Sequence, residues 1–535
     1  MVLNNIEKKA NNHKLLSEVL GVKMLMTLIL VFVFGGIYAY FSRSYRYWQK
    51  RGVPQLEPCF PFGDMGTVIF RRQNMGDKIK EIYDNCRARG HDYVGLYFFS
   101  RKAFLPLDPG LIKNILSKDF QHFFDRGIYY DEENDPLSAH LFSLAGPKWK
   151  TLRAKLTPAY SSGKLKFMFG TILKCGLEMK DVLEEFANRD GEIEIKEILA
   201  RYSTDVIGCC AFGLECNCLR SKDAEFRAMG KRAFTQTVGD LLKMIIIRSF
   251  PALAKVLHIG VFSATVTSFF QGVVRETIEY RERNNVIRKD FMQLLIQLKN
   301  NGRIDDDGQR ESQGVNSGTE NKLTVDEAAA QAFIFFLAGF ETTSTTTSFA
   351  LFEMARDDRI QKKARKELFR VLKEHDQTLD YEAVSELRYL DTILYETMRK
   401  YPPAPVFLRK CTERYPIPKS DGAFIEKGQS VLIPCYGLHR DPVYFPDPEV
   451  FDPDRFSDEN KSKIYDGTYI PFGAGPRNCI GMRFAMIQAK IALALTLRHF
   501  DFTLSERTKL PLKMETKGII LAPIGGLWLN LSRRF

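Results

Sequence analysis

One loop near the carboxyl end limits the fold and the chemistry of this chain more than any other stretch. Residues 471–481 surround a single cysteine, Cys479, with three glycines and two prolines, and a strongly apolar helical run over residues 482–500 follows at once. Glycine lets the backbone come close to a planar ligand. The start of a helix favours a thiolate, because its peptide N–H groups carry partial positive charge. We therefore predict that Cys479 is the thiolate ligand of a flat metal macrocycle.

Two simpler interpretations explain less of this loop. Gly473 and Gly475 begin a dinucleotide-binding GxGxxG pattern, but the sixth position is Asn478 and no β-branched strand precedes it. A lone cysteine is usually a small buried hydrophobic residue, which leaves the rest of the pattern unexplained. In our interpretation Phe472 shields the sulfur and Arg477 pairs with a carboxylate of the ligand.

Composition narrows the class of protein and its partners. With 535 residues, 45% of them hydrophobic, the chain can bury a large core. The net charge of +12 favours an anionic membrane surface or an acidic protein as partner; because Lys and Arg are spread along the chain, nucleic acid is disfavoured. The ten cysteines have no regular spacing, which argues against a disulfide framework. Cys209, Cys210, Cys216 and Cys218 come closest to a cluster, and we interpret them as reduced, mostly buried thiols.

An uncharged segment near the amino end predicts a membrane anchor. Residues 24–41 carry no charge and are just long enough to cross a bilayer core of about 30 Å as a helix. A cleaved signal peptide is disfavoured, because a basic cluster follows the segment and no small-x-small cleavage site does. We expect a polar, disordered extension over residues 1–23 and a basic, proline-rich hinge over residues 42–66. The aromatic residues expected at the membrane interface are Tyr38, Tyr40, Tyr45, Tyr47 and Trp48.

The remaining residues, 67–535, are predicted to form one mainly α-helical domain with small β-sheets. Residues 94–98 and 103–107 are expected to pair in a sheet. Residues 121–143 form a long irregular stretch, and such a loop usually lines or covers a site. Residues 300–321 are polar, charged and glycine-rich, so we expect an exposed, poorly ordered loop there.

A long apolar helix is predicted to cross the centre of the domain. It opens at Thr324 with a capping box that Glu327 completes, and it runs to about residue 354. At its middle, Glu341 and Thr342 place an acid beside an alcohol. A buried acid is costly without partners, and a threonine hydroxyl can take a backbone bond that loosens the helix. We assign function to this pair and packing to residues 343–347.

These patterns together resemble the cytochrome P-450 superfamily over essentially the whole chain after residue 50. Residues 472–481 are similar to its haem-binding loop, and residues 338–343 to its oxygen-binding groove. A further likeness is to the structural triad of the family, here Glu396, Arg399 and Arg455. The resemblance implies a cytochrome P-450 fold preceded by a single transmembrane helix.

The resemblance also implies a haem b site. Cys479 would be the axial ligand of the iron, and Glu341 and Thr342 would relay protons to dioxygen. The residues that would contact the macrocycle are Phe472, Gly473, Gly481 and Ala338. Those that would hold its propionates are Arg477, Trp149, Arg153, Arg126 and Arg409.

The implied activity is mono-oxygenation with dioxygen as co-substrate. Electrons would come from NADPH through a separate reductase, with a cytochrome b-type protein as an optional second donor, because the chain has no flavin module of its own. The expected basic docking face consists of Lys148, Lys150, Lys155, Arg477 and Arg483. The resemblance places the anchor in the endoplasmic reticulum membrane and the catalytic domain in the cytosol.

The substrate class follows only from the apolar side chains expected near the cavity. These are Phe123, Phe124, Phe333, Phe336, Phe340, Val406 and Phe407, and they predict a small lipophilic substrate. Residues 234–261 are expected to form helices over its entrance. Residues 157–166 and the hinge resemble the insect microsomal group that metabolises xenobiotics and insecticides. The alternatives are a hormone or fatty-acid hydroxylase, a haem-thiolate isomerase that needs no reductase, and a lipophile carrier without catalysis.

Overall fold

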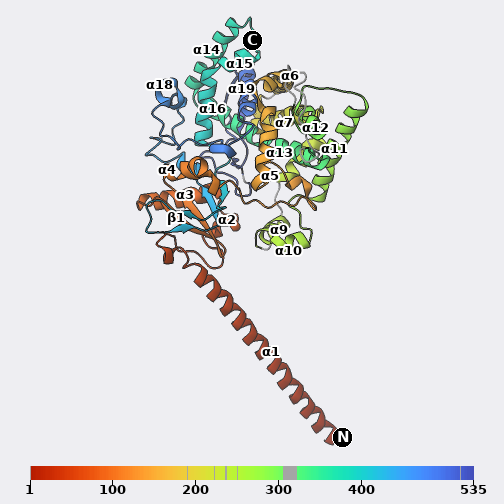
Figure 1. Cartoon of the computed structure of the whole chain (residues 1–535), viewed down its shortest axis with the longest axis vertical. Coiled ribbons are helices and arrows are strands. Elements are labelled where there is room, and N and C mark those ends of the chain that lie inside the picture. The colour runs from red at the N-terminus through yellow and green to blue at the C-terminus, as the bar shows by residue number, and fades with distance from the viewer. Residues whose placement is uncertain are drawn as a thin grey trace.

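The computed structural model describes residues 2–189, 191–221, 223–234, 238–249, 251–304, 322–518 and 520–534. A mainly helical domain carries small sheets, and one long helix, α1 (Val2–Ser44), projects away from it (Figure 1). The helical stretch from Val19 to Arg51 is long and apolar enough to cross a membrane. The prediction of disorder over residues 1–23 is wrong for the described part. Residues 2–20 contain neither glycine nor proline, and extending an existing helix costs far less than starting one.

The segment after α1 is bound to the domain. Trp48, predicted at the membrane interface, is instead fully buried, and its indole N–H donates to the Leu96 carbonyl at 3.3 Å. The ring lies against Gly95, where a Cβ atom would come within 2.2 Å of it. Burial of a large aromatic ring outweighs its preference for the interface, because the whole ring leaves water. Helix α1 is therefore joined to the domain through a packed contact.

The domain begins with short elements and continues with long helices. Its α-helices in chain order are α2 (Gly66–Ile69), α3 (Met75–Ala88), α4 (Pro109–Lys113), α5 (Gly146–Leu156), α6 (Ser162–Ala187), α7 (Ile195–Ile207), α8 (Glu225–Phe234), α9 (Val238–Ser249), α10 (Pro251–Val256), α11 (Ala264–Arg283), α12 (Phe291–Asn301), α13 (Val325–Arg356), α14 (Asp358–Glu374), α15 (Tyr381–Glu386), α16 (Arg388–Lys400), α17 (Cys435–Leu438), α18 (Asp458–Lys461) and α19 (Met482–His499). Two π-helical turns, η2 (Asn114–Lys118) and η6 (Gly208–Phe212), directly follow α4 and α7.

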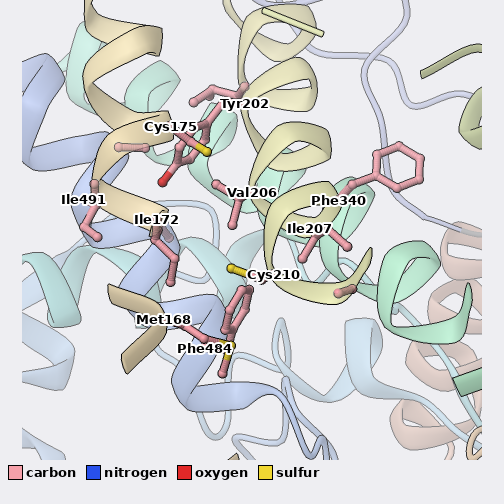
Figure 2. Close-up of a cluster of buried hydrophobic side chains, with 14 of the residues drawn as sticks. Met168, Ile172, Cys175, Tyr202, Val206, Ile207, Cys210, Phe340, Phe484 and Ile491 are labelled. Carbon is pink, nitrogen blue, oxygen red and sulfur yellow. The ribbon is translucent and has the colours of Figure 1, made fainter. Parts of the chain in front are cut away.

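Helix α13 runs through the middle of the domain, as predicted. Its capping box is present: the Thr324 hydroxyl accepts from the Glu327 N–H, and the Glu327 carboxylate accepts from the Thr324 N–H. It packs along α7 and also contacts α11, α12, α16 and α19. Figure 2 shows part of this core, to which α7 contributes Ile207, α13 contributes Phe340, and α19 contributes Phe484 and Ile491.

The strands form small sheets beside the helices. In the four-stranded sheet the order is β1 (Tyr93–Phe98), β2 (Arg101–Pro106), β7 (Ser430–Ile433), β4 (Phe407–Lys410). The predicted pairing near residues 94–98 and 103–107 is confirmed, with Val94 opposite Leu105 in an antiparallel register. The other sheets contain β3 (Glu192–Glu194), β9 (Trp528–Arg533) and β8 (Phe500–Leu504), and β5 (Tyr415–Pro416) with β6 (Phe424–Ile425).

Two predicted loops have different outcomes. Residues 121–143 are mostly irregular, with single turns only, as expected. Of the predicted loop over residues 300–321, the first two residues end α12, and residues 305–321 lie outside the described residues.

Candidate active site

The loop that carries Cys479 is held by its own backbone and by a neighbouring turn. The Cys479 N–H donates to the Phe472 carbonyl at 2.8 Å, and α19 begins directly after Gly481. Gly473 and Gly475 have φ values of 71° and 69°, a region that favours glycine. At Gly475 a Cβ atom would lie 1.9 Å from the Leu116 carbonyl of η2. This glycine is therefore required by contact with the protein itself.

The Cys479 side chain lies deep in the domain and yet keeps room beside its sulfur. It keeps accessible surface, yet it is surrounded so closely that burial raises the pKa of the thiol. The Gly481 N–H and the positive charges of Arg153 and Arg126 oppose that rise in the pKa. A thiol in this setting is kept from bulk water but is open to a ligand.

The central helix has an accessible face in the same region. Ala338 and Thr342 lie one turn apart on α13 and keep accessible surface, although most of their neighbours on this helix are buried. Phe335, just before them, contacts Phe484 of α19 with ring centroids 5.2 Å apart. Because Phe484 follows Cys479 by five residues, the accessible face of α13 lies near the cysteine loop. The small side chain at Ala338 leaves room on this face.

Arginines surround the cysteine loop. Arg153 of α5 donates to the carbonyl and to the side-chain oxygen of Asn478, both at 2.9 Å. Arg126 donates to the Arg477 carbonyl at 3.1 Å. The guanidinium of Arg477 lies 4.3 Å from the ring centre of Trp149. The resemblance grouped these residues, and the structure brings them together.

The guanidinium groups of Arg477 and Arg409 are incompletely paired. Burial and repulsion from Arg409 and Arg153 lower the pKa of Arg477 to about 9, despite the opposing charge of Asp125. Burial lowers the pKa of Arg409, on β4, to about 10. Nε and Nη1 of Arg477 and Nε of Arg409 are buried without a hydrogen-bond partner. Such unpaired cations are costly unless an anionic ligand meets them.

The residues present therefore fit haem. A cysteine sulfur that keeps accessible surface, an accessible small residue on the facing helix, and unpaired arginine nitrogens match the iron, the flat ring and the two carboxylates of that group. Cys479 would hold the iron, and Arg477 and Arg409 offer the unpaired donors for the carboxylates. Arg153 and Arg126 would add positive charge from the rim.

Glu341 and Thr342 lie side by side but point to different partners. The Glu341 carboxylate forms an ion pair with Lys196 of α7, with Nζ and Oε1 2.7 Å apart. The Thr342 hydroxyl donates to the Ala338 carbonyl. Sequence reasoning required a partner for the acid but missed Lys196, because α7 lies about 140 residues earlier and no local pattern joins the two helices.

Two groups of predicted residues are placed differently from expectation. Phe123, Phe333, Phe336 and Phe340 are at most 1% exposed and pack in the core instead of lining a cavity. Phe333 and Phe336 pack against Phe270 of α11, with ring centroids 4.9 and 5.1 Å apart, and Phe336 also contacts Phe340, so these rings are held away from any open surface. Arg477 is 1% exposed, so it cannot belong to a docking face. Its position beside Trp149 requires burial.

The predicted triad is present beneath the cysteine loop. Arg399 donates to both carboxylate oxygens of Glu396 at 2.7 and 2.8 Å, and neither side chain has any exposed surface. Arg455 approaches the same carboxylate at 3.5 Å. Arg399 also donates to the carbonyl of His439, whose ring accepts from the Ile470 N–H at 2.9 Å just before the loop. The triad thus connects α16 to the segment that carries Cys479.

The fold and the site together define a haem-thiolate monooxygenase. The family model described as cytochrome P450 matches residues 54–529. The chain belongs to the cytochrome P450 family.

Similar proteins come from Drosophila melanogaster. Cytochrome P450 6a2 is 41% identical over 515 residues, covering 95% of this chain and all of that protein. Probable cytochrome P450 6a21 is 41% identical over 510 residues, covering 95% of this chain and 99% of the relative. Cytochrome P450 6a9 is 40% identical over 514 residues, covering 96% of this chain and all of the relative. The similarity to these insect proteins confirms the family resemblance drawn from the motifs.

Proposed function

We propose that this enzyme inserts one oxygen atom from dioxygen into small lipophilic xenobiotics, insecticides among them. Electrons would come from NADPH through a separate reductase, with a cytochrome b-type protein as an optional donor. The observation that carries this proposal is the accessible Cys479 sulfur among unpaired arginine nitrogens, close to the open face of α13 at Ala338 and Thr342. The likeness of residues 157–166 and of the hinge to the insect microsomal group supports the xenobiotic class of substrate.

Each part of the site has a separate task in this proposal. When bound, haem supplies the iron at which dioxygen is activated, and thiolate ligation favours O–O cleavage. Cys479 would supply the thiolate, and Arg477 and Arg409 would hold the ring through its carboxylates. The Thr342 hydroxyl would release the Ala338 carbonyl and bond instead to a water or oxygen beside it. In that position it would pass on a proton. Glu341, held by Lys196, supplies an acid next to it.

Apolar residues support a position on the endoplasmic reticulum membrane. Helices α9 and α10 lie at the end of the domain from which α1 leaves (Figure 1). The exposed apolar side chains of this end are Phe60, Phe70, Met244, Leu253, Val256 and Leu257. In our proposal α1 crosses the membrane once, this end of the domain rests on the bilayer, and lipophilic substrates enter from it. The catalytic domain then faces the cytosol.

A reductase would dock on the basic side of the cysteine loop. Arg483, at the start of α19, and Lys150, on α5, are both exposed. Lys148 is instead paired with Glu132, with Nζ and Oε2 2.6 Å apart. We propose that the exposed cations attract an acidic partner.

The proposal is tested with the full chain in membranes, combined with a P-450 reductase. We expect a thiolate-type Soret band for the reduced, CO-bound protein, and products of lipophilic insecticides that carry one ¹⁸O atom from ¹⁸O₂. Product formation should require both NADPH and the reductase. Turnover without a reductase would identify an isomerase, and a nitrogen-ligated type of band from folded protein would contradict thiolate ligation.

Replacing Thr342 with alanine is expected to separate oxygen use from product formation. Product per NADPH should fall by up to about 10²-fold, the low end of what positioned proton transfer contributes, while the thiolate-type spectrum stays. Thr347→Ala is the matched control, because the Thr347 hydroxyl makes the same kind of bond, to the Thr343 carbonyl at 2.8 Å, but is buried. Unchanged coupling in Thr342→Ala over several substrates would exclude the proton role. Product and NADPH consumption are measured in the same reaction.

A further inference from the structure

A second pocket, away from Cys479, is lined by thiols. It has a volume of about 460 Å³ and lies between α6 and the turn η6. Three cysteines line it, Cys175 of α6, Cys209 of η6 and Cys216 of the loop that follows. Free thiols that share a solvent-filled pocket can react with small polar oxidants, which a packed core excludes.

Cys175 and Cys209 lie together in this pocket. The elements that carry them, α6 and η6, pack against each other, and each thiol shifts the pKa of the other. Cys209 keeps accessible surface, whereas Cys175 is 3% exposed. An accessible sulfur backed by a buried one is the arrangement in which the first sulfur is oxidised and the second resolves it.

The electrostatic setting distinguishes Cys209 from its neighbours. The neighbouring Cys175 thiol lowers the pKa of the Cys209 thiol, helped by Lys174, whereas burial and the carboxylates of Asp205 and Glu215 act against this. Lys174 is itself paired with Glu215 at 2.7 Å, so its help is partial. The nearby Cys209 sulfur and burial raise the pKa of Cys175, which stays a thiol. Thiolate character therefore concentrates on Cys209.

The nearby cysteines are less suited to react. Cys210 is 1% exposed, and burial raises its pKa well above the usual value; Figure 2 shows it among apolar side chains, with Cys175 labelled on the neighbouring helix. Burial also raises the pKa of Cys216. Its sulfur lies 2.3 Å from the position that a Cβ atom on Gly208 would take. Both therefore remain protonated.

We propose that Cys209 and Cys175 form a peroxide-reactive dithiol that closes to a disulfide. The Cys209 thiolate attacks one oxygen of hydrogen peroxide, the O–O bond breaks, and with one proton the products are a Cys209 sulfenic acid and water. The Cys175 sulfur then attacks the Cys209 sulfur, the S–O bond breaks, and a second water leaves with the thiol proton. Two electrons pass from the two thiols to one peroxide, and a dithiol reductant restores the starting state.

The cross-link would join two supports of the active site. On α6, Gly176 packs against Ile491 and Leu495 of α19, the helix that follows Cys479. The turn η6 continues α7, and Ile207 of α7 touches α13 at Gly339, where a Cβ atom would come within 2.6 Å. A disulfide between α6 and η6 therefore fixes the distance between helices on either side of the thiol pocket.

The test treats the full-length, haem-loaded protein in detergent with hydrogen peroxide, blocks remaining thiols, and maps unreduced tryptic peptides by mass spectrometry. We expect residues 175–180 linked to residues 202–220, lighter by two hydrogens than the separate peptides, with fragment ions that assign the bond to Cys209. A reductant should remove this species. Cys59, which is exposed, reports exposure to the oxidant.

Single variants separate the proposed pair from other thiols. Cys209→Ser should lose the cross-link, Cys210→Ser should keep it, and Cys175→Ser should let a dimedone probe trap the sulfenic acid at Cys209. These readouts do not depend on monooxygenase activity. A bond from Cys209 to Cys216, a cross-link that persists in Cys209→Ser, or oxidation of Cys59 with Cys209 unmodified would each overturn the proposal.

Discussion

Replacing Cys479 with alanine is expected to abolish the thiolate-type Soret band of the reduced, CO-bound protein together with all NADPH-dependent product formation. The sulfur is the only group of the loop that can bind iron as a thiolate, and its backbone N–H is already committed to Phe472. Alanine keeps the backbone bond and removes only the ligand. The absorption spectrum and the product yield are measured on the same preparation.

The control for this variant keeps the number of cysteines equal. Cys435→Ala removes a fully buried thiol whose sulfur lies 3.6 Å from the ring of His439, so it reports the cost of losing a packed cysteine near the same scaffold. We expect this protein to retain the thiolate-type band. A band of unchanged type in Cys479→Ala, or its loss in Cys435→Ala alone, would contradict the assignment of the ligand.

Local patterns predicted the elements on which the chemistry depends. The capping box at Thr324 fixed the start of α13, because the two reciprocal bonds need only residues three apart. The glycines and prolines around Cys479 predicted an irregular loop before a helix, as η9 (Gly475–Arg477) and α19 show. The family resemblance then grouped residues from distant segments, such as Trp149 and Arg477, that no spacing rule could join.

Tertiary contacts account for what the sequence did not show. Trp48 follows an apolar segment and looks like a membrane-interface residue, yet the absence of a side chain at Gly95 creates the space that buries it. Phe333 and Phe336 of α13 pack against α11, and Phe336 also packs against η6, which depends on how these elements are arranged in space. Gly475 appeared to serve a ligand, whereas Leu116 requires it. Each of these partners lies tens to hundreds of residues away in the chain.

Replacing Glu396 with glutamine is expected to destabilise the domain by about 3–5 kcal/mol, the usual cost of removing one partner from a buried ion pair. The volume of the side chain hardly changes, so the loss reports the charge. Burial raises the pKa of Glu396, and the bonds from Arg399 only partly oppose this. The pair as a whole therefore contributes less than its geometry suggests, but Arg399 alone would be an uncompensated buried cation. Urea titration of the detergent-solubilised protein measures the change.

The matched control is Glu374→Gln, which breaks an exposed ion pair with Arg370 on α14. The Arg370 Nη1 and Glu374 Oε1 atoms are 3.0 Å apart, and both side chains are more than half exposed. Losing this pair should lower the free energy of unfolding by only about 0.3–0.5 kcal/mol.

Because Arg399 also holds the His439 carbonyl next to the cysteine loop, Glu396→Gln should lose haem during purification before it loses helical structure. The fraction of protein with a thiolate-type band, compared with the helical circular dichroism signal, separates these two losses. A Glu396→Gln protein as stable and as fully loaded as the control would mean that Arg455 and the backbone carbonyls hold the scaffold without the acid.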